Sequence, residues 1–225
     1  MSYRIAIIGG TGKEGKGLAY RWALAGHEVV IGSRQIEKAQ LVADEVNMLL
    51  GGKKPTVVGL ENSQAADWCE IVTLTVPFSA HVPMLESLKE IVKGKILIDV
   101  TVPIVPPKIT TVQMPEAGSA GKEAQAILGP ETRVVCAFQN ISYERLLKQG
   151  DIACDVLVCG TTKEAREVVL QLVEDAGMTG WDAGVLENSM VVEGLTSLLL
   201  YINKNYGSKE AGIIITGVQR DRKVE

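Results

Sequence analysis

A glycine-rich turn near the start of the chain constrains the fold more than any other feature of the sequence. Residues 10–15 read Gly-Thr-Gly-Lys-Glu-Gly, which fits the pattern G-x-G-x-x-G, and they stand between an apolar run at residues 4–8 and a helical stretch. Such a turn between a strand and a helix is typical of a dinucleotide-binding unit. We expect Gly10 to allow the tight turn, Gly12 to let the backbone approach a pyrophosphate, and Gly15 to let the helix pack closely on the strand.

The rest of the chain alternates short apolar runs with helical stretches. Strands are expected at residues 4–8, 28–31, 56–59, 71–76, 95–100, 133–138, 155–159 and 179–182, and helices at residues 16–25, 35–50, 62–69, 81–92, 119–128, 163–176 and 189–203. Short strands separated by helices of about ten residues or more require parallel crossovers. The sequence therefore predicts an α/β fold with a doubly wound, mostly parallel Rossmann-type sheet.

Gly184 marks the expected start of a small C-terminal module, residues 185–225, which follows a Rossmann domain of residues 1–184. Its long helix is apolar around most of its circumference, with Glu193 as the charged exception. Because a helix that is apolar all round is buried, we expect a second subunit to cover it and the protein to be a homodimer. Packing against the sheet of the same chain is the alternative. Residues 212–216 read as a further strand, which adds to the sheet or pairs across the dimer.

The residues after the second strand decide which dinucleotide is bound. An NAD site usually has a carboxylate there, which holds the ribose 2'-hydroxyl. This chain instead has Ser33, Arg34 and, one helical turn later, Lys38. Both cations favour a 2'-phosphate, and cations at a helix N-terminus are unfavourable unless an anion lies nearby. The sequence therefore predicts NADP(H) rather than NAD(H).

Two further strands end in proline, at Pro77 and Pro103. The carboxyl ends of parallel strands form the ligand crevice of an open sheet, so both prolines are expected there. His81 follows the first of them at the start of a helix, where the helix dipole lowers the pKa of a histidine. A solvated or capping role is expected for His81, with a role as an acid in the site as the alternative.

Composition excludes several classes of protein. Over 225 residues, 46% hydrophobic and 22% charged side chains are typical of a folded globular chain, and a net charge of -4 leaves no basic surface for nucleic acid. No apolar run approaches the roughly 18 residues of a membrane span, and no signal peptide is evident, so the expected compartment is the cytoplasm. The four cysteines form no C-x-x-C pair and read as buried reduced thiols, and with two histidines they leave little material for a metal site.

Several segments occur together in an order that resembles one family. They are residues 7–12, residues 32–34 with Lys38, residues 75–77, residues 155–160 and residues 182–184 through 193–196. In this order they resemble the NADPH-dependent reductases of the 8-hydroxy-5-deazaflavin coenzyme F-420. The resemblance covers nearly the whole chain, and only its second half is specific to that family.

The resemblance implies that NADP(H) lies along the crevice and that the deazaflavin stacks on the nicotinamide, so that hydride passes directly between the two rings. The cofactor-binding residues expected on this basis, together with the glycine-rich loop, are Gly10, Thr11, Gly12, Lys13, Glu14, Gly15, Ser33, Arg34, Lys38, Thr75, Val76, Pro77, Phe78, Ala137, Gln139, Asn140, Ile141, Leu195 and Thr196. No catalytic side chain is required, because the two cofactors carry the chemistry.

The chain departs from the family pattern at two places. The family commonly has a histidine where Gln139 stands, and a glutamine amide can donate a hydrogen bond to a ring oxygen but is never a cation. The second departure is the proline-rich segment 105–116, a candidate lid or pocket-narrowing loop.

Two other functions fit the same residues. An NADPH-dependent reductase of a small imine or keto acid would need a proton donor, for which Tyr143, Lys148 and Lys204 are candidates. A non-catalytic NADP(H)-binding module is the other alternative. Hydride transfer to an acceptor distinguishes an enzyme from such a module.

Overall fold

The computed structural model describes residues 2–53, 55–148 and 150–218. Its strands are β1 (Arg4–Ile8), β2 (Glu28–Ser33), β3 (Val58–Glu61), β4 (Ile71–Leu74), β5 (Ile96–Asp99), β6 (Arg133–Cys136), β7 (Asp155–Gly160) and β8 (Thr179–Gly184). Its helices are α1 (Lys13–Leu24), α2 (Ile36–Leu50), α3 (Asn62–Trp68), η1 (Phe78–Ala80), α4 (His81–Leu88), α5 (Ala120–Leu128), α6 (Tyr143–Leu146), α7 (Lys163–Asp175), η2 (Leu186–Asn188) and α8 (Ser189–Tyr206).

Within the described residues the strands form one eight-stranded sheet in the order β3-β2-β1-β4-β5-β6-β7-β8. All neighbouring pairs are parallel except β6 and β7. The expected doubly wound, mostly parallel sheet is therefore confirmed. The strand order reverses between β1 and β4, and ligands of such sheets bind at the carboxyl ends of the strands beside that reversal.

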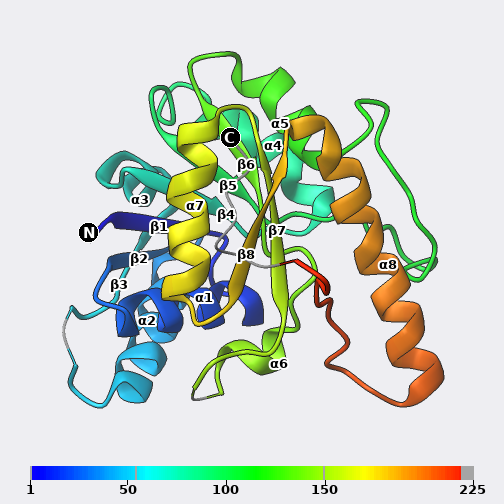
Figure 1. Cartoon of the computed structure of the whole chain (residues 1–225). Helices are drawn as coiled ribbons and strands as arrows, with labels where there is room; N and C mark the ends of the chain where they lie inside the picture. The colour runs from blue at the N-terminus through cyan, green and yellow to red at the C-terminus, as the bar shows by residue number, and fades with distance from the viewer. Residues whose placement is uncertain (1, 54, 149, 219–225) are drawn as a thin grey trace.

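Alternating side chains of β1 show how the sheet is covered on both faces. Ile5 and Ile7 are fully buried in one core, to which α1, α2 and α7 contribute, and Ala6 and Ile8 are fully buried in a second core with α3, α4 and α5. Figure 1 shows the first group of helices in front of the sheet and the second group behind it. Burial on both faces explains why the strands read as continuous apolar runs.

Several boundaries differ from the sequence-based expectation. Helix α1 begins at Lys13, three residues earlier than expected. Gly15 and Gly17 lie inside this helix, where neighbouring atoms leave no room for a side chain. A Cβ on Gly17 would lie 2.5 Å from the Cβ of Leu146 in α6, a short helix that the sequence did not predict.

The strand expected at residues 212–216 is wrong, because this segment has no strand conformation. It still runs beside β7, where the Asp155 N–H donates to the carbonyl of Ile213 and the Ile215 N–H donates to the Asp155 carboxylate. The last part of the predicted C-terminal module, residues 219–225, lies outside the described residues. The division of the chain at Gly184 stays a prediction.

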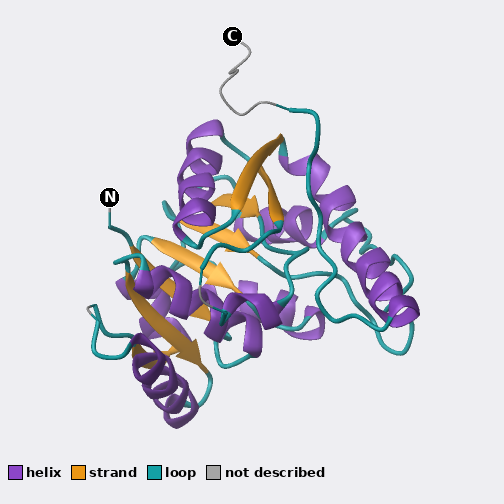
Figure 2. Ribbon diagram, turned by 60° about the horizontal axis from the view of Figure 1, so that its bottom comes forward, coloured by secondary structure: helices purple, strands orange, loops and turns teal. Residues whose placement is uncertain are grey.

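Helix α8 lies at the edge of the molecule, away from most of the sheet (Figures 1 and 2). The expectation that it is buried all round is wrong for the single chain. Its buried positions are mostly small or polar, whereas Val191, Leu198 and Tyr206 are exposed by 66%, 50% and 82%. This apolar face is the part of the helix that a second subunit would have to cover.

Candidate functional site: a dinucleotide crevice with a buried charged network

The glycine-rich loop joins β1 to α1 with the tight geometry expected of it. The N–H of Gly10 donates to the carbonyls of Ile7 and Gly32, and a Cβ on Gly15 would lie 2.6 Å from the Cα of Gly10. Gly12 is the N-cap residue of α1, and nothing lies within 4 Å of the place of its missing Cβ. The positive end of α1 and open space beside the backbone therefore meet at one point, as an anion requires.

Asn62, at the start of α3, fixes this loop from the other side. Its Oδ1 atom accepts a hydrogen bond from the N–H of Gly9, and a Cβ on Gly32 would lie 2.8 Å from the same oxygen. Gly9 has a φ of +69°, so it is Gly9, next to the predicted Gly10, that takes the left-handed conformation of the turn.

A cavity of about 680 Å³ opens in front of the loop. It is lined by Gly9, Thr11, Ser33, Arg34, Gln35, Lys38, Glu61, Asn62, Ser63, Val76, Pro77, Ala80, Pro83, Met84, Ser87 and Leu88. Ser33, Arg34 and Lys38 after β2 thus line one space with Val76 and Pro77 after β4, whereas the predicted Thr75 and Phe78 are not among its lining residues. The contribution of β3, α3 and α4 was missed, although the carboxyl end of β3 was an available signal.

The two cations predicted to select a 2'-phosphate are on the wall of this cavity. Arg34 and Lys38 are exposed, and neither forms an ion pair with another residue in the described part of the chain. Ser33 is buried beside them, and its hydroxyl accepts a hydrogen bond from the N–H of Gln35. Two unpaired cations beside a hydroxyl at the first turn of α2 form a site for a phosphate.

Lys13 and Glu14 lie in the first turn of α1. The Lys13 ammonium lies 4.6 Å from the centre of the Tyr143 ring and donates a hydrogen bond to its hydroxyl group. Tyr143 is held in place because Arg21 donates to the carbonyls of Leu146 and Gly150 just beyond it. Of the other two donor candidates, the Lys148 ammonium pairs with Glu210, and Lys204 lies in the last turn of α8.

The segment after β6 meets α8, as the resemblance implied. Phe138 has a φ of +72° and is buried edge-on against Trp22, and this turn directs Gln139 and Asn140 inward. The Asn140 amide donates to the carbonyl of Val192 and to the hydroxyl of Thr196, which itself donates to the carbonyl of Gln139.

One N–H of the Gln139 amide is already bonded within the protein. It donates to the carbonyl of Asp99 over 2.8 Å, and because the amide has a second N–H, donation to a ring oxygen stays a prediction. The Oε1 of Gln139 and the Oδ1 of Asn140 are buried without a partner in the described residues. Each is an amide oxygen that can still accept a hydrogen bond.

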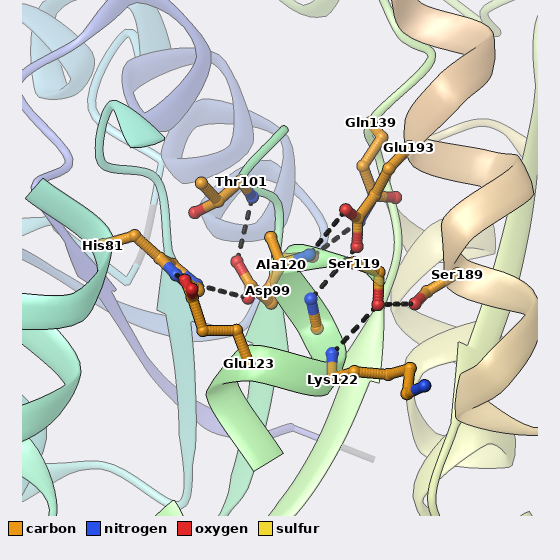
Figure 3. Close-up of polar contacts among 11 residues, drawn as sticks. His81, Asp99, Thr101, Ser119, Ala120, Lys122, Glu123, Gln139, Ser189 and Glu193 are labelled. Carbon is orange, nitrogen blue, oxygen red and sulfur yellow. Dashed lines mark hydrogen bonds and ion pairs between the residues drawn. The ribbon is translucent and has the colours of Figure 1, made fainter. Parts of the chain in front are cut away.

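His81 departs most from expectation. Its ring is fully buried rather than solvated, with Nε2 2.8 Å from a carboxylate oxygen of Asp99 and Nδ1 2.9 Å from a carboxylate oxygen of Glu123 (Figure 3). Burial lowers the pKa of His81, but the hydrogen bonds and charges of Asp99 and Glu123 outweigh it, so the net shift is upward. The expected lowering by the helix dipole is wrong, because the ring points sideways into the core between two carboxylates.

A second buried carboxylate joins this region to α8. Glu193 accepts hydrogen bonds from the backbone N–H groups of Ala120 (2.7 Å) and Gly121 (3.0 Å) at the start of α5. Ser189, also on α8, donates to the hydroxyl oxygen of Ser119, the N-cap residue of α5 (Figure 3). Burial raises the pKa of Glu193 to about 8, against the two backbone donors, which lower it.

The cysteine, histidine and acidic side chains of the described residues form no second site. The four cysteines are free and buried, and burial raises the thiol pKa of Cys69 and of Cys159 to about 11. Among residues 2–53, 55–148 and 150–218, no group of three or more His, Cys, Asp or Glu side chains is arranged to hold a metal ion. No helix in the same residues is long and apolar enough to cross a membrane.

Comparison with known proteins identifies the family. A sequence profile described as "NADP oxidoreductase coenzyme F420-dependent" matches residues 4–103. The chain is 39% identical over 221 residues to the F420-dependent NADP reductase of Methanothermobacter marburgensis, covering 96% of this chain and 99% of that protein. The chain belongs to the coenzyme F420-dependent NADP oxidoreductase family.

Two further relatives of this family agree. The F420-dependent NADP reductase of Methanocaldococcus jannaschii is 38% identical over 223 residues, covering 96% of this chain and 99% of that protein. The crystal structure of a proposed F420-dependent NADP reductase from Arthrobacter sp. superposes with a TM-score of 0.80 at 25% identity, covering 96% of this chain and all of the other.

Proposed function

We propose that this member of the family is an oxidoreductase that transfers a hydride directly between NADP(H) and the deazaflavin coenzyme F-420. The observation that carries the proposal is the identity to F420-dependent NADP reductases over nearly the whole chain, beyond the Rossmann half that many NADP enzymes share. When both cofactors are bound, they supply the hydride chemistry. The chain's own residues bind and align them.

The residues for NADP(H) follow from the cavity. The loop at Thr11 and Gly12 with the N-terminus of α1 would hold the pyrophosphate, and Arg34 and Lys38 would hold the 2'-phosphate. Val76 and Pro77 would lie against the nicotinamide end, beyond the strand reversal. The two cations fit such a ligand, because both line the cavity and neither forms an ion pair with a described residue, although Glu61 lines the same cavity.

The residues for the deazaflavin follow from the segment after β6 and its contacts with α8. We assign this side to Phe78, residues 137–141, Leu195 and Thr196. The two acceptor oxygens without partners, on Gln139 and Asn140, fit a ring N–H or a carboxamide, both of which donate hydrogen bonds. Both side chains are buried, so a ring edge that met them would be shielded from water.

A spectroscopic assay tests this function. The purified protein is mixed with NADPH and oxidised coenzyme F-420, and the loss of the deazaflavin's visible absorbance is followed, with NADH as the control. Rapid bleaching with NADPH and little with NADH is the expected result. Tight binding of NADPH without bleaching would contradict the deazaflavin assignment and leave the nucleotide site intact.

The exposed apolar face of α8 and the free cysteines each support a smaller proposal. We assign the apolar face to the interface of a homodimer, which sedimentation of the wild-type chain and of Leu198→Glu would test: the wild type should sediment as a dimer and the variant as a monomer. A wild-type monomer at micromolar concentration would contradict this. We also place the protein in the cytoplasm, where free thiols such as its four cysteines stay reduced.

A further inference from the structure

The buried charged network around His81 has no assigned role in hydride transfer. His81 is the first residue of α4, and it directly follows the turn that carries Val76, Pro77 and Ala80. These three residues line the nucleotide cavity, as do Pro83, Met84, Ser87 and Leu88 of α4 itself. The ring of His81 is not among the lining residues and points the other way, toward β5 and α5 (Figure 3).

Hydrogen-bond geometry indicates the protonation state of the ring. Each ring nitrogen faces a carboxylate oxygen, and Asp99 also accepts the N–H of Thr101 with its other oxygen, as an ionised carboxylate does. The Glu123 carboxylate, which is partly exposed, is likewise a hydrogen-bond acceptor. Both nitrogens must then carry a proton, so that His81 is an imidazolium that donates to both carboxylates.

The second histidine provides a contrast within the same chain. His27 is also buried beside a carboxylate, with Nε2 2.9 Å from Asp175. Its Nδ1 accepts a hydrogen bond from the backbone N–H of Tyr3, however, so that only Nε2 carries a proton. His27 precedes β2 at the opposite end of the sheet from the cavity.

We propose that His81 is a positioning residue for NADP(H): as an imidazolium bridging Asp99 and Glu123, it fixes the wall of the nucleotide cavity formed by residues 76–80 and α4. The proposal rests on the nucleotide site proposed above. The backbone carbonyl of Asp99 also accepts a hydrogen bond from the amide of Gln139. The carboxyl end of β5 therefore joins this wall to the residues assigned to the deazaflavin. Without the second proton, a ring nitrogen lone pair would face a carboxylate, and the wall would be pushed away from β5 or α5.

Nuclear magnetic resonance tests the protonation state without any substitution. With only two histidines in the chain, ¹⁵N labelling of histidine gives two resolved rings. At neutral pH, we expect both nitrogens of one ring to be protonated and the other ring to be the Nε2–H tautomer. On addition of NADP⁺ the signals of the imidazolium should shift and those of the neutral ring should not. A neutral His81, or imidazolium signals that NADP⁺ leaves unchanged, would overturn the proposal.

Variants test the effect on binding. In His81→Gln the amide oxygen faces one of the two carboxylates and is repelled by it. This repulsion should displace the wall of the nucleotide cavity and raise the Kd of NADPH by on the order of 10-fold to 100-fold. In H81Q/E123Q the introduced amides can pair with each other and with Asp99, and the net charge of the cluster returns to that of the wild type, so affinity should recover. His27→Gln is the matched buried control and should bind NADPH like the wild type.

The pH profile separates this role from a general loss of stability. The charged groups facing His81 are Asp99 on β5 and Glu123 on α5, and Glu193 on α8 is close enough for His81 to lower its pKa. Because the imidazolium is needed, NADPH affinity of the wild type should fall at alkaline pH relative to that of H81Q/E123Q. Titration of the nucleotide and of Lys38 affects both proteins alike, so its effect cancels in the ratio of the wild-type Kd to the Kd of H81Q/E123Q. A ratio that does not change with pH, or equal affinity of H81Q and the wild type for NADPH, would contradict the proposal. A wild type that does not bind NADPH at all would instead contradict the nucleotide site itself.

Discussion

Removing both cations of the 2'-phosphate site should change which nucleotide the protein accepts. In Arg34→Ala/Lys38→Ala the wall of the cavity loses two exposed side chains that have no ion pair with the described residues. The backbone is unaffected, because neither side chain is part of a core. The double variant should therefore fold like the wild type.

The magnitude follows from the exposure of the two side chains. A charge-assisted hydrogen bond contributes about 1.5 to 3 kcal/mol, and for exposed groups we take the lower value. Two such bonds give about 3 kcal/mol, which corresponds to a roughly 100-fold increase in the Kd of NADPH. NADH has no 2'-phosphate, so its Kd should be nearly unchanged. High salt should weaken NADPH binding by the wild type more than by the variant.

Titration of nucleotide fluorescence measures both affinities in one experiment. Arg4→Ala is the control, because Arg4 begins β1 at the amino-terminal end of the parallel strands, opposite the cavity, and its removal also lowers the positive charge. Equal losses of affinity for NADPH and NADH in the double variant, or the same loss in Arg4→Ala, would refute the assignment of the phosphate site.

Three further predictions concern the glycine-rich loop and Glu193. Gly15→Ala should lower the unfolding free energy by about 1 to 3 kcal/mol in a denaturant titration, because the new Cβ would lie 2.6 Å from Gly10 and 2.9 Å from the hydroxyl of Thr75. Gly12→Ala should leave stability unchanged, since its Cβ meets nothing within 4 Å, yet weaken NADPH binding; unchanged binding would argue against a pyrophosphate there. Since burial raises the pKa of Glu193 from 4.5 to about 8, the stability that its protonated form contributes is fully present below pH 4.5 and is lost as the pH rises to about 8. The unfolding free energy of Glu193→Gln should therefore depend less on pH in this window, and identical pH profiles would contradict the assignment.

Local patterns in the sequence predicted the fold well. The alternation of apolar runs and helical stretches, and the glycine loop with Ser33, Arg34 and Lys38, depend on residues close together in the chain. Residues 137–141 and 195–196 were joined by the resemblance, and the structure brings them into contact through Asn140 and Thr196. The start of α1 was misplaced because the glycines that allow close packing are also poor helix formers.

Tertiary contacts decided what the sequence did not predict. His81 meets Asp99 and Glu123, which lie 18 and 42 residues further along the chain, so nothing next to it in the sequence indicates a charged partner. The carbonyl of Asp99 on the neighbouring strand takes one N–H of the Gln139 amide, a contact that no residue next to Gln139 in the sequence indicates. The apolar pattern of α8 indicated that both of its faces are covered, yet the chain itself covers only one.

Direct transfer between the two cofactors is the central claim, and isotope tracing tests it most directly. NADPH carrying deuterium at the transferable position of the nicotinamide is mixed with oxidised coenzyme F-420 and the protein in ordinary water. The account predicts that the deuterium appears on the ring carbon of the reduced deazaflavin, seen by mass spectrometry and magnetic resonance. Reduced coenzyme without deuterium, or no reduction at all, would contradict it.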